Sequence, residues 1–190
     1  KIVFSGVGKS AAELETALKF DIFCFNVESK SELELLNSIA CKLEKIASIS
    51  LRVNPDIDAE THPYIATGMR DSKFGIPIRD ATAVYKYAAT LKNVKISGID
   101  CHIGSQITEL APIRQAARQC VKLGIELKDM GIDIQHIDVG GGLGVVYKDE
   151  QPPSIEQYIS VIKDELKGLN IRLILEPGRS IIAEAGILVT

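Results

Sequence analysis

Residues 134–144 read IQHIDVGGGLG, in which Ile134, Ile137 and Val139 lead directly into a glycine-rich segment. A short run rich in Ile and Val and bounded by turn residues is typical of a strand buried in a parallel sheet. Five similar runs occur along the chain. The six predicted strands are residues 2–4, 22–26, 50–54, 96–102, 134–139 and 172–175. Because helical stretches separate them, the sequence predicts repeated βα units, a parallel sheet and an α/β fold.

The predicted helices carry local start signals. A serine followed three residues later by Glu or Gln occurs at Ser10, Ser29 and Ser154, which is the pattern of a reciprocal capping box. Apolar residues then recur every three or four positions, as at Leu33, Leu36, Ala40 and Leu43 and at Ile155, Ile159, Ile162 and Leu166. This spacing predicts one buried stripe on each helix, packed on the outside of the sheet.

The longest connection runs from Asn54 to a helix expected near Asp80. It contains Pro55, Pro63, Gly68, Gly75 and Pro77, which favour an extended loop over a helix. Long loops at the carboxyl ends of strands commonly bind ligands.

Composition narrows the class of protein. The 190 residues are 46% hydrophobic and 25% charged, which is ordinary for one globular domain with a sizeable core. The 25 acidic and 22 basic side chains give a net charge of -3 without charged blocks, which argues against binding to nucleic acid or anionic lipid. No apolar stretch is long enough to span a membrane, and the first residues do not resemble a signal peptide. Small-molecule chemistry is therefore expected.

The four cysteines predict reduced, buried thiols. No two of them form a CxxC pair, which argues against both a zinc site and a disulfide framework; they are Cys24, Cys41, Cys101 and Cys120. This pattern favours a reducing compartment, with the cytosol as the expected location.

Two glycine patterns fall short of nucleotide-binding motifs. Residues 6–10 (GVGKS) lack the glycine that GxxxxGK[ST] requires at position 3, where Val3 stands. A GxGxxG motif beginning at Gly140 requires glycine at position 145, where Val145 stands. Consecutive glycines still allow backbone N–H groups to approach a phosphate, although a simple turn after the strand explains them equally well.

Two other strands end in groups suited to a ligand site. Glu176 and Arg179 flank a Pro-Gly corner after residues 172–175, and they suit either a surface ion pair or a carboxylate that faces a ring nitrogen. His102 lies where a strand end is followed by Gly104 and Ser105, so a ligand-facing imidazole is expected. By contrast, the contexts of His62, in a loop, and His136, at a strand start, favour structural roles. No metal-binding or nucleophile-elbow motif is present.

Six motifs together resemble the diaminopimelate decarboxylase family across nearly the whole chain. They are RVNP at 52–55, HPYIATG at 62–68, SKFGI at 72–76, HIGSQ at 102–106, DVGGGLG at 138–144 and EPGR at 176–179. Related ornithine and arginine decarboxylases share the glycine run and EPGR, but usually differ at HIGSQ and at KFGI. The resemblance implies a fold-type III enzyme on a TIM-type (β/α)8 barrel, and so decides between a barrel and an open doubly wound sheet.

The resemblance also implies a cofactor and residue roles. The cofactor is pyridoxal 5′-phosphate (PLP), the substrate is meso-diaminopimelate and the product is L-lysine. His102 stacks on the cofactor ring and Glu176 faces its nitrogen, so both are implied as catalytic, while Arg179 takes a substrate carboxylate. The implied cofactor-binding residues are His102, Ser105, Gly140, Gly141, Gly142, Gly144, Glu176, Gly178 and Arg179. The intact protein is expected to be a homodimer.

One expected motif is missing. The family's cofactor lysine lies in an Ala-x-Lys-Ala-Asn-like motif on the first barrel strand, whereas Lys9, Lys73 and Lys148 lie in other contexts. By the resemblance, residues 1–190 are a partial PLP-binding barrel domain that spans about strands 3 to 8, without the first two strands and the C-terminal β domain. We therefore expect a fragment that is inactive alone. Another fold-type III diamino-acid decarboxylase, or a non-catalytic PLP-binding module, remains an alternative.

Overall fold

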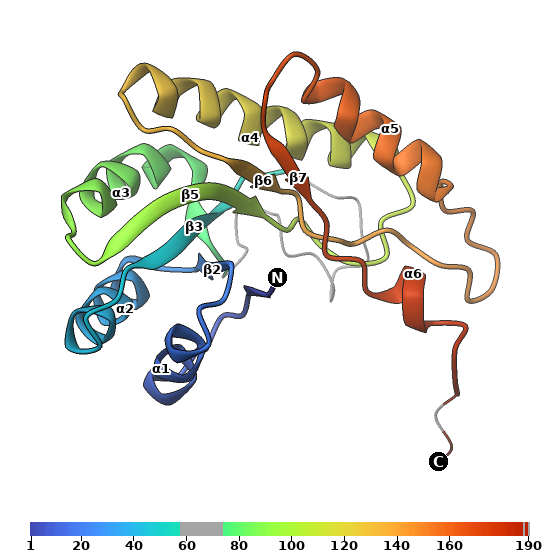
Figure 1. The fold of residues 1–190 in the computed structure, drawn as a ribbon. Coiled ribbons are helices and arrows are strands. Elements are labelled where there is room, and N and C mark those ends of the chain that lie inside the picture. Colours follow the sequence, from blue (N-terminus) through green and yellow to red (C-terminus); the bar gives the residue numbers. More distant parts are fainter. Residues whose placement is uncertain (58–73, 188, 190) are drawn as a thin grey trace.

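The computed structural model describes residues 1–57, 74–187 and 189. Within these ranges a parallel sheet curves into a half-barrel, with helices on its convex face (Figure 1). The strands are β1 (Val3–Phe4), β2 (Cys24–Val27), β3 (Ala47–Asn54), β4 (Ile76–Pro77), β5 (Val94–Cys101), β6 (His136–Asp138) and β7 (Arg172–Ile174). Their order is β1-β2-β3-β5-β6-β7, and β4 pairs with the end of β3. The predicted α/β fold and incomplete barrel are confirmed.

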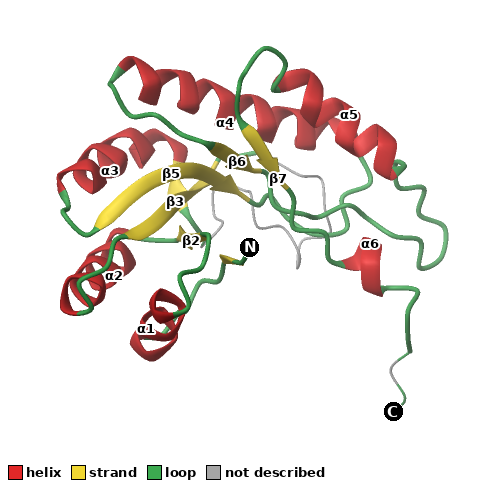
Figure 2. Cartoon of the chain, in the orientation of Figure 1, coloured by secondary structure: helices red, strands yellow, loops and turns green. Residues whose placement is uncertain are grey.

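Helices alternate with the strands, as Figure 2 shows. They are α1 (Ala11–Lys19), α2 (Lys30–Lys42), α3 (Ile78–Thr90), α4 (Leu110–Asp129), α5 (Ile155–Glu165) and α6 (Arg179–Ile182). The reciprocal capping boxes predicted at Ser10 and Ser154 are present. The box predicted at Ser29 is only half formed, because the Glu32 side chain accepts from the backbone N–H of Glu28 and pairs with a lysine instead.

All six predicted strands exist, but three details were wrong. The two-residue strand β4 was assigned to the long loop, because Pro77 disfavours a strand. The structure tolerates this proline because β4 is short and ends at Pro77. Ile155 was expected on a buried stripe, yet it is 52% exposed, because the first turn of α5 borders an open cavity. Cys41 is exposed near the end of α2, while Cys24, Cys101 and Cys120 are buried free thiols as predicted.

Several sequence predictions concern residues outside the described ranges. These are the loop position of His62, the context of Lys73, and the parts of the long connection that contain Pro63 and Gly68.

A buried polar cluster of His136 and Ser50 lies within the sheet. His136 begins β6, as predicted for a structural histidine, and its Nε2 lies 2.8 Å from the Ser50 hydroxyl on β3. Gly98 on β5 makes room for this ring, because a Cβ there would lie 2.2 Å from Nε2. Burial lowers the pKa of His136 to about 4, with a further contribution from Arg172, so the imidazole is neutral at pH 7.

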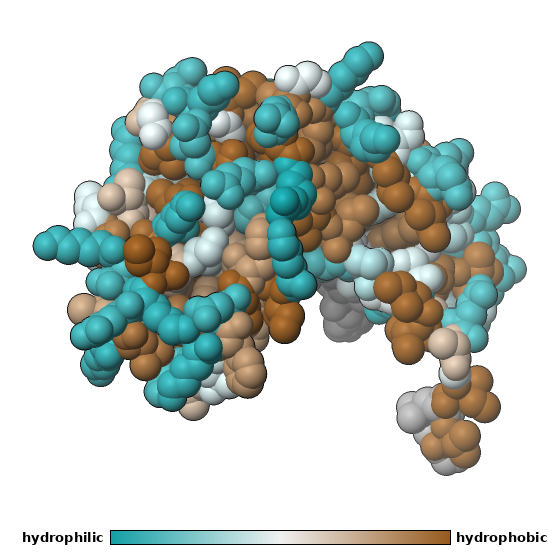
Figure 3. Space-filling view, in the orientation of Figure 1, coloured by the Kyte–Doolittle hydropathy of each residue, from teal (hydrophilic) through white to brown (hydrophobic). Residues whose placement is uncertain are grey.

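The concave side of the molecule is open. Seen from the direction of Figure 1, the surface is hollowed between the regions of α1 and α6 (Figure 3). Apolar side chains are exposed near the carboxyl end of the chain, including Ile181, Ile182, Ile187 and Val189. None of the helices in the described ranges has the combination of length and apolar character that a bilayer span needs.

Candidate functional site

The carboxyl ends of the parallel strands meet at one rim, and polar side chains collect there. Arg52, Asp100 and Asp138 are register neighbours on β3, β5 and β6, so their side chains lie on the same face of the sheet. We call these three residues the polar row. In complete barrels of this kind, the carboxyl-terminal rim is where ligands bind.

The polar row combines one buried ion pair with two buried acids. Arg52 contacts Glu28 at 2.6 Å, with both side chains largely buried. Burial raises the pKa of Asp138 to about 6, and the nearby Glu176 carboxylate adds to this effect. Burial, followed by Asp138 and Glu176, raises the pKa of Asp100 well above its usual range. The rim therefore carries less negative charge at neutral pH than its acidic residues suggest.

The glycine run forms a tight loop after β6. Gly140 and Gly142 have φ values of +68° and +103°, which favour glycine. A Cβ on Gly141 would lie 2.1 Å from the carbonyl oxygen of Glu176, so this loop packs directly on the segment after β7. The Glu176 N–H also donates to the Gly140 carbonyl at 2.8 Å. The structure thus brings two of the predicted site motifs together.

Most amides of this loop already have partners within the protein. The N–H groups of Gly140, Gly141 and Gly144 donate to Asp138 Oδ1, His102 Nδ1 and the Ile107 carbonyl, respectively. Among the hydrogen bonds of the described residues, the amides of Gly142 and Leu143 have no acceptor. The loop is therefore not a uniform cradle of donors, and these two amides are its available ones.

His102 lies just beyond β5, against the glycine loop. The Gly141 N–H donates to its Nδ1 at 3.3 Å, which assigns the ring proton to Nε2. Burial lowers the pKa of His102, and Arg52 lowers it further, while Glu176 opposes the shift. A Cβ on Gly140 would lie 2.7 Å from Nδ1, so only glycine permits this approach. The structure therefore presents a neutral, half-buried imidazole at the rim.

Glu176 follows β7 and turns toward the polar rim. Its Oε1 accepts a hydrogen bond of 2.5 Å from the hydroxyl of Ser5, which follows β1. Within the described residues it makes no ion pair with Arg179, so the alternative of a surface Glu-Arg pair is wrong. Arg179 begins α6 and is half-exposed.

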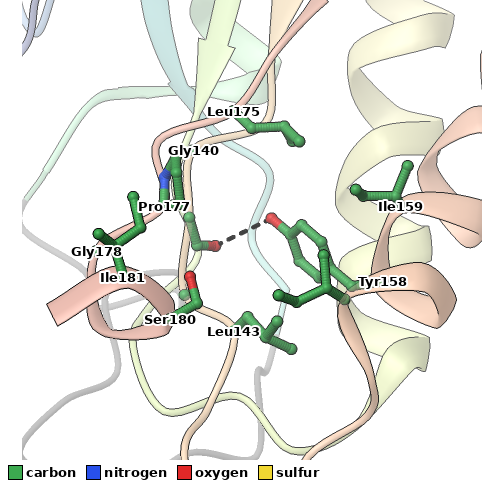
Figure 4. A pocket seen from close by; sticks show the side chains of 12 residues that line it. Gly140, Leu143, Tyr158, Ile159, Leu175, Pro177, Gly178, Ser180 and Ile181 are labelled. Atoms are coloured by element: carbon green, nitrogen blue, oxygen red, sulfur yellow. Dashed lines mark hydrogen bonds between the residues drawn. The ribbon is translucent and has the colours of Figure 1, made fainter. Parts of the chain in front are cut away.

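Two cavities adjoin the glycine loop on the side of α5. One of about 210 Å³ lies between the loop, Tyr158 on α5 and the segment from Leu175 to Ile181 (Figure 4). The Tyr158 hydroxyl donates to the Gly141 carbonyl at 3.5 Å. Gly178 borders this cavity, and Arg179 borders an adjoining one of about 520 Å³. Neither cavity is lined by His102 or Glu176, so the predicted site residues lie in two adjacent groups around the loop.

Ser105 and its neighbour Gln106 lie in the segment that covers the glycine loop. Ser105 is half-exposed. Gln106 donates to the Val145 carbonyl at 2.5 Å and accepts from the Val145 N–H at 3.2 Å, which ties the two loops together. Gln106 was recognised only as part of a motif, and this clamp is its structural role.

Lys9 cannot serve as an exposed amine at this rim. Its ammonium donates to the carbonyls of Gly6 and Asn26 and to Glu32, which uses all three hydrogens, and its side chain is 1% exposed. Lys148 lies in an exposed loop. These positions agree with the prediction that neither belongs to a cofactor-lysine motif.

Sequence reasoning missed several rim residues. Ser5, Asn26, Glu28 and Asp100 had no assigned role, and Arg52 and Asp138 were named only as parts of motifs. A usable signal did exist, since each is a polar residue within or directly after an otherwise apolar run. Their partners could not be read from the sequence, because the contacts join different strands.

A parallel half-barrel whose rim collects a glycine loop, an imidazole and a carboxylate is typical of the α/β-barrel class of proteins, whose ligands bind at this rim. Residues 1–183 match the family described as pyridoxal-dependent decarboxylase, pyridoxal binding domain. The chain belongs to this family, whose cofactor is PLP.

Individual relatives make the assignment narrower. The chain is 55% identical to the diaminopimelate decarboxylase of Haemophilus influenzae over 190 residues, which cover 100% of this chain and 46% of that protein. The crystal structure of diaminopimelate decarboxylase from Helicobacter pylori complexed with L-lysine matches with a TM-score of 0.92 and 45% identity. That match covers 96% of this chain and 46% of the other. The resemblance expected from the motifs is confirmed.

A more distant structure shares only the fold. Lysine decarboxylase from Selenomonas ruminantium matches with a TM-score of 0.76 and 23% identity, over 90% of this chain and 43% of that one. The chain spans about half the length of the curated relatives it matches.

Proposed function

We propose that the whole protein containing this chain is a PLP-dependent diaminopimelate decarboxylase that converts meso-diaminopimelate to L-lysine and carbon dioxide. The observation that carries this proposal is the convergence of Glu176, His102 and the glycine loop at one barrel rim, in a chain with 55% identity to a diaminopimelate decarboxylase. The lysine decarboxylase from Selenomonas ruminantium, which has a rival activity, shares only the fold with this chain at 23% identity.

The residues at the rim fit this cofactor. Gly142 and Leu143 offer two backbone amides, and the close packing around Gly141 leaves no room for a side chain in the loop. Such amides suit a phosphate group, and Gly178 and Ser105 lie on neighbouring segments. The residues present therefore support the predicted phosphate site, with Gly142 and Leu143 as its main loop donors.

Bound PLP supplies a conjugated ring that accepts the electrons left when carbon dioxide departs. Glu176 would face the ring nitrogen, where its carboxylate would favour the protonated pyridine. His102 would pack against the ring face as a neutral imidazole, consistent with its lowered pKa. Gly140 keeps this imidazole close to the loop because it has no side chain.

Arg179 and groups outside residues 1–190 complete the proposed site. Arg179 takes a substrate carboxylate, for which its guanidinium is suited. The relatives are about twice as long as this chain, so in the whole protein that we propose the cofactor lysine and a β domain lie outside residues 1–190. The whole protein acts as a homodimer in the cytoplasm.

Substrate profiling of the whole protein tests the proposal. With PLP present, we expect carbon dioxide release from meso-diaminopimelate and formation of L-lysine, with much slower turnover of L-lysine, L-ornithine and L-arginine. Preferred turnover of one of these three would establish a different fold-type III decarboxylase. Binding of PLP without release of carbon dioxide from any of them would establish a non-catalytic binding module.

A further inference from the structure

A chain of hydrogen bonds runs beneath the candidate site, from the carboxylate after β7 to the glycine loop after β6. The Ser5 hydroxyl donates to Glu176 Oε1 at 2.5 Å, and the Asn26 amide Nδ2 donates to Ser5 Oγ at 2.9 Å. Asn26 Nδ2 also lies 3.5 Å from Asp138 Oδ2, and Asp138 Oδ1 accepts from the Gly140 N–H at 2.9 Å. The chain therefore joins four segments that are distant in sequence.

The direction of these bonds is determined by the groups involved. Nδ2 of Asn26 can only donate, so it occupies a lone pair of the Ser5 oxygen. The single hydroxyl hydrogen of Ser5 is then directed to Glu176 Oε1. The second N–H of Asn26 Nδ2 is directed toward Asp138 Oδ2, which supports the same orientation of the amide. Asn26 and Asp138 are fully buried, which restricts alternative partners.

Backbone contacts already fix the two loops against each other. Glu176 N–H donates to the Gly140 carbonyl, and Gly141 packs against the Glu176 carbonyl oxygen. Neither contact restrains rotation of the Glu176 side chain. Its carboxylate orientation therefore depends on Ser5, whose hydroxyl is the hydrogen-bond donor to it within the described residues.

We propose that Ser5 is a positioning residue, which Asn26 orients and which aims the Glu176 carboxylate at the ring nitrogen of the bound cofactor. This inference rests on the proposed function. It assigns a role to a residue that follows β1, on the far side of the half-barrel from β7 in the strand order. Ser5 acts through Glu176 and does not itself touch the cofactor.

The test compares two cofactors in the whole protein. PLP has the ring nitrogen, whereas its 1-deaza analogue carries a C–H group in that place. Ser5→Ala should weaken PLP binding about tenfold, as expected for loss of a hydrogen bond to a charged group, and should leave affinity for the 1-deaza analogue nearly unchanged. Equilibrium dialysis measures both dissociation constants without relying on turnover. In steady-state assays, the same variant should lower kcat more than it raises KM.

Matched variants separate positioning from general damage. Ser48→Ala is the control, because Ser48 lies near the start of β3 and its hydroxyl donates to the Ser97 side chain. This variant should change the affinity for neither cofactor. Ser5→Thr retains the donor and should restore tight PLP binding. If Ser5→Ala fails to fold, the isosteric Ser5→Cys, a weaker donor, allows the same comparison.

The outcomes are distinguishable. Equal weakening of both cofactors by Ser5→Ala, or no weakening of either, would overturn the positioning role while leaving the proposed function intact. Absence of PLP binding by the unaltered protein would overturn the proposed function and this inference with it.

Discussion

Replacing Gly141 with alanine probes the contact that joins the glycine loop to the segment after β7. The added Cβ would lie 2.1 Å from the carbonyl oxygen of Glu176. The φ angle of Gly141 is not among the positive values found in this loop, so the substitution introduces a steric clash without backbone strain. It therefore isolates the packing of the two loops from the conformational preference of glycine.

The size of the effect follows from the distance. In proteins, a Cβ atom and a non-bonded heavy atom are at least 3.0 Å apart. The two loops must therefore separate by about 0.9 Å, the difference between 3.0 and 2.1 Å. Because the opposing atom belongs to the backbone, no side-chain rotation relieves the clash. Overpacking of this kind costs about 1–3 kcal/mol. We expect Gly141→Ala to lower the free energy of unfolding by about 2 kcal/mol and to weaken PLP binding at least about tenfold.

Urea unfolding and equilibrium dialysis with PLP measure the two effects. Gly8→Ala is the matched control, because a Cβ at Gly8 meets no atom within 4 Å and its φ is not positive. We expect the control to retain both stability and affinity. Unchanged stability and PLP affinity in Gly141→Ala would refute the close packing of the two loops and its role in the site.

Three further substitutions test separate parts of the rim. Glu176→Gln should lower kcat about 100-fold with the fold unchanged, because an electrostatic partner of the ring nitrogen is lost; wild-type turnover would exclude that role. Glu28→Gln leaves Arg52 buried without its carboxylate and should cost about 3 kcal/mol of stability, whereas an unchanged urea midpoint would show that the pair is not needed. The pKa of Asp138 is raised from 3.8 to about 6, so its ionisation destabilises the fold as pH rises through that range. Between pH 4 and pH 7, the free energy of unfolding of Asp138→Asn should therefore rise by up to about 3 kcal/mol relative to that of the parent protein, as measured by urea unfolding. A difference between the two proteins that does not change with pH would contradict this.

The sheet was predictable because each strand leaves a local pattern. Residues 134–139 contain Ile134, Ile137 and Val139 and end at a glycine run, and the capping serines at Ser10 and Ser154 mark where helices begin. The short strand β4 leaves no such pattern, since two residues that end in proline resemble a loop. The exposure of Ile155 depends on the cavity beside α5, which helical periodicity does not encode.

The candidate site was predictable only in part. Glu176, His102 and the glycine run were identified because each follows an apolar run and belongs to a motif. Ser5 is 171 residues from Glu176, and their hydrogen bond exists only because curvature of the sheet brings the ends of β1 and β7 together. Similarly, the hydrogen bond from the Gly141 amide to His102 depends on how two loops pack, and no local sequence pattern predicts that packing.

The most direct test of the central claim is a crystal structure of the whole protein with PLP bound. We expect a Glu176 carboxylate oxygen within about 3 Å of the pyridine nitrogen, and phosphate oxygens that accept from the amides of Gly142 and Leu143. A cofactor whose ring nitrogen faces another residue, with Glu176 turned away from it, would contradict the account.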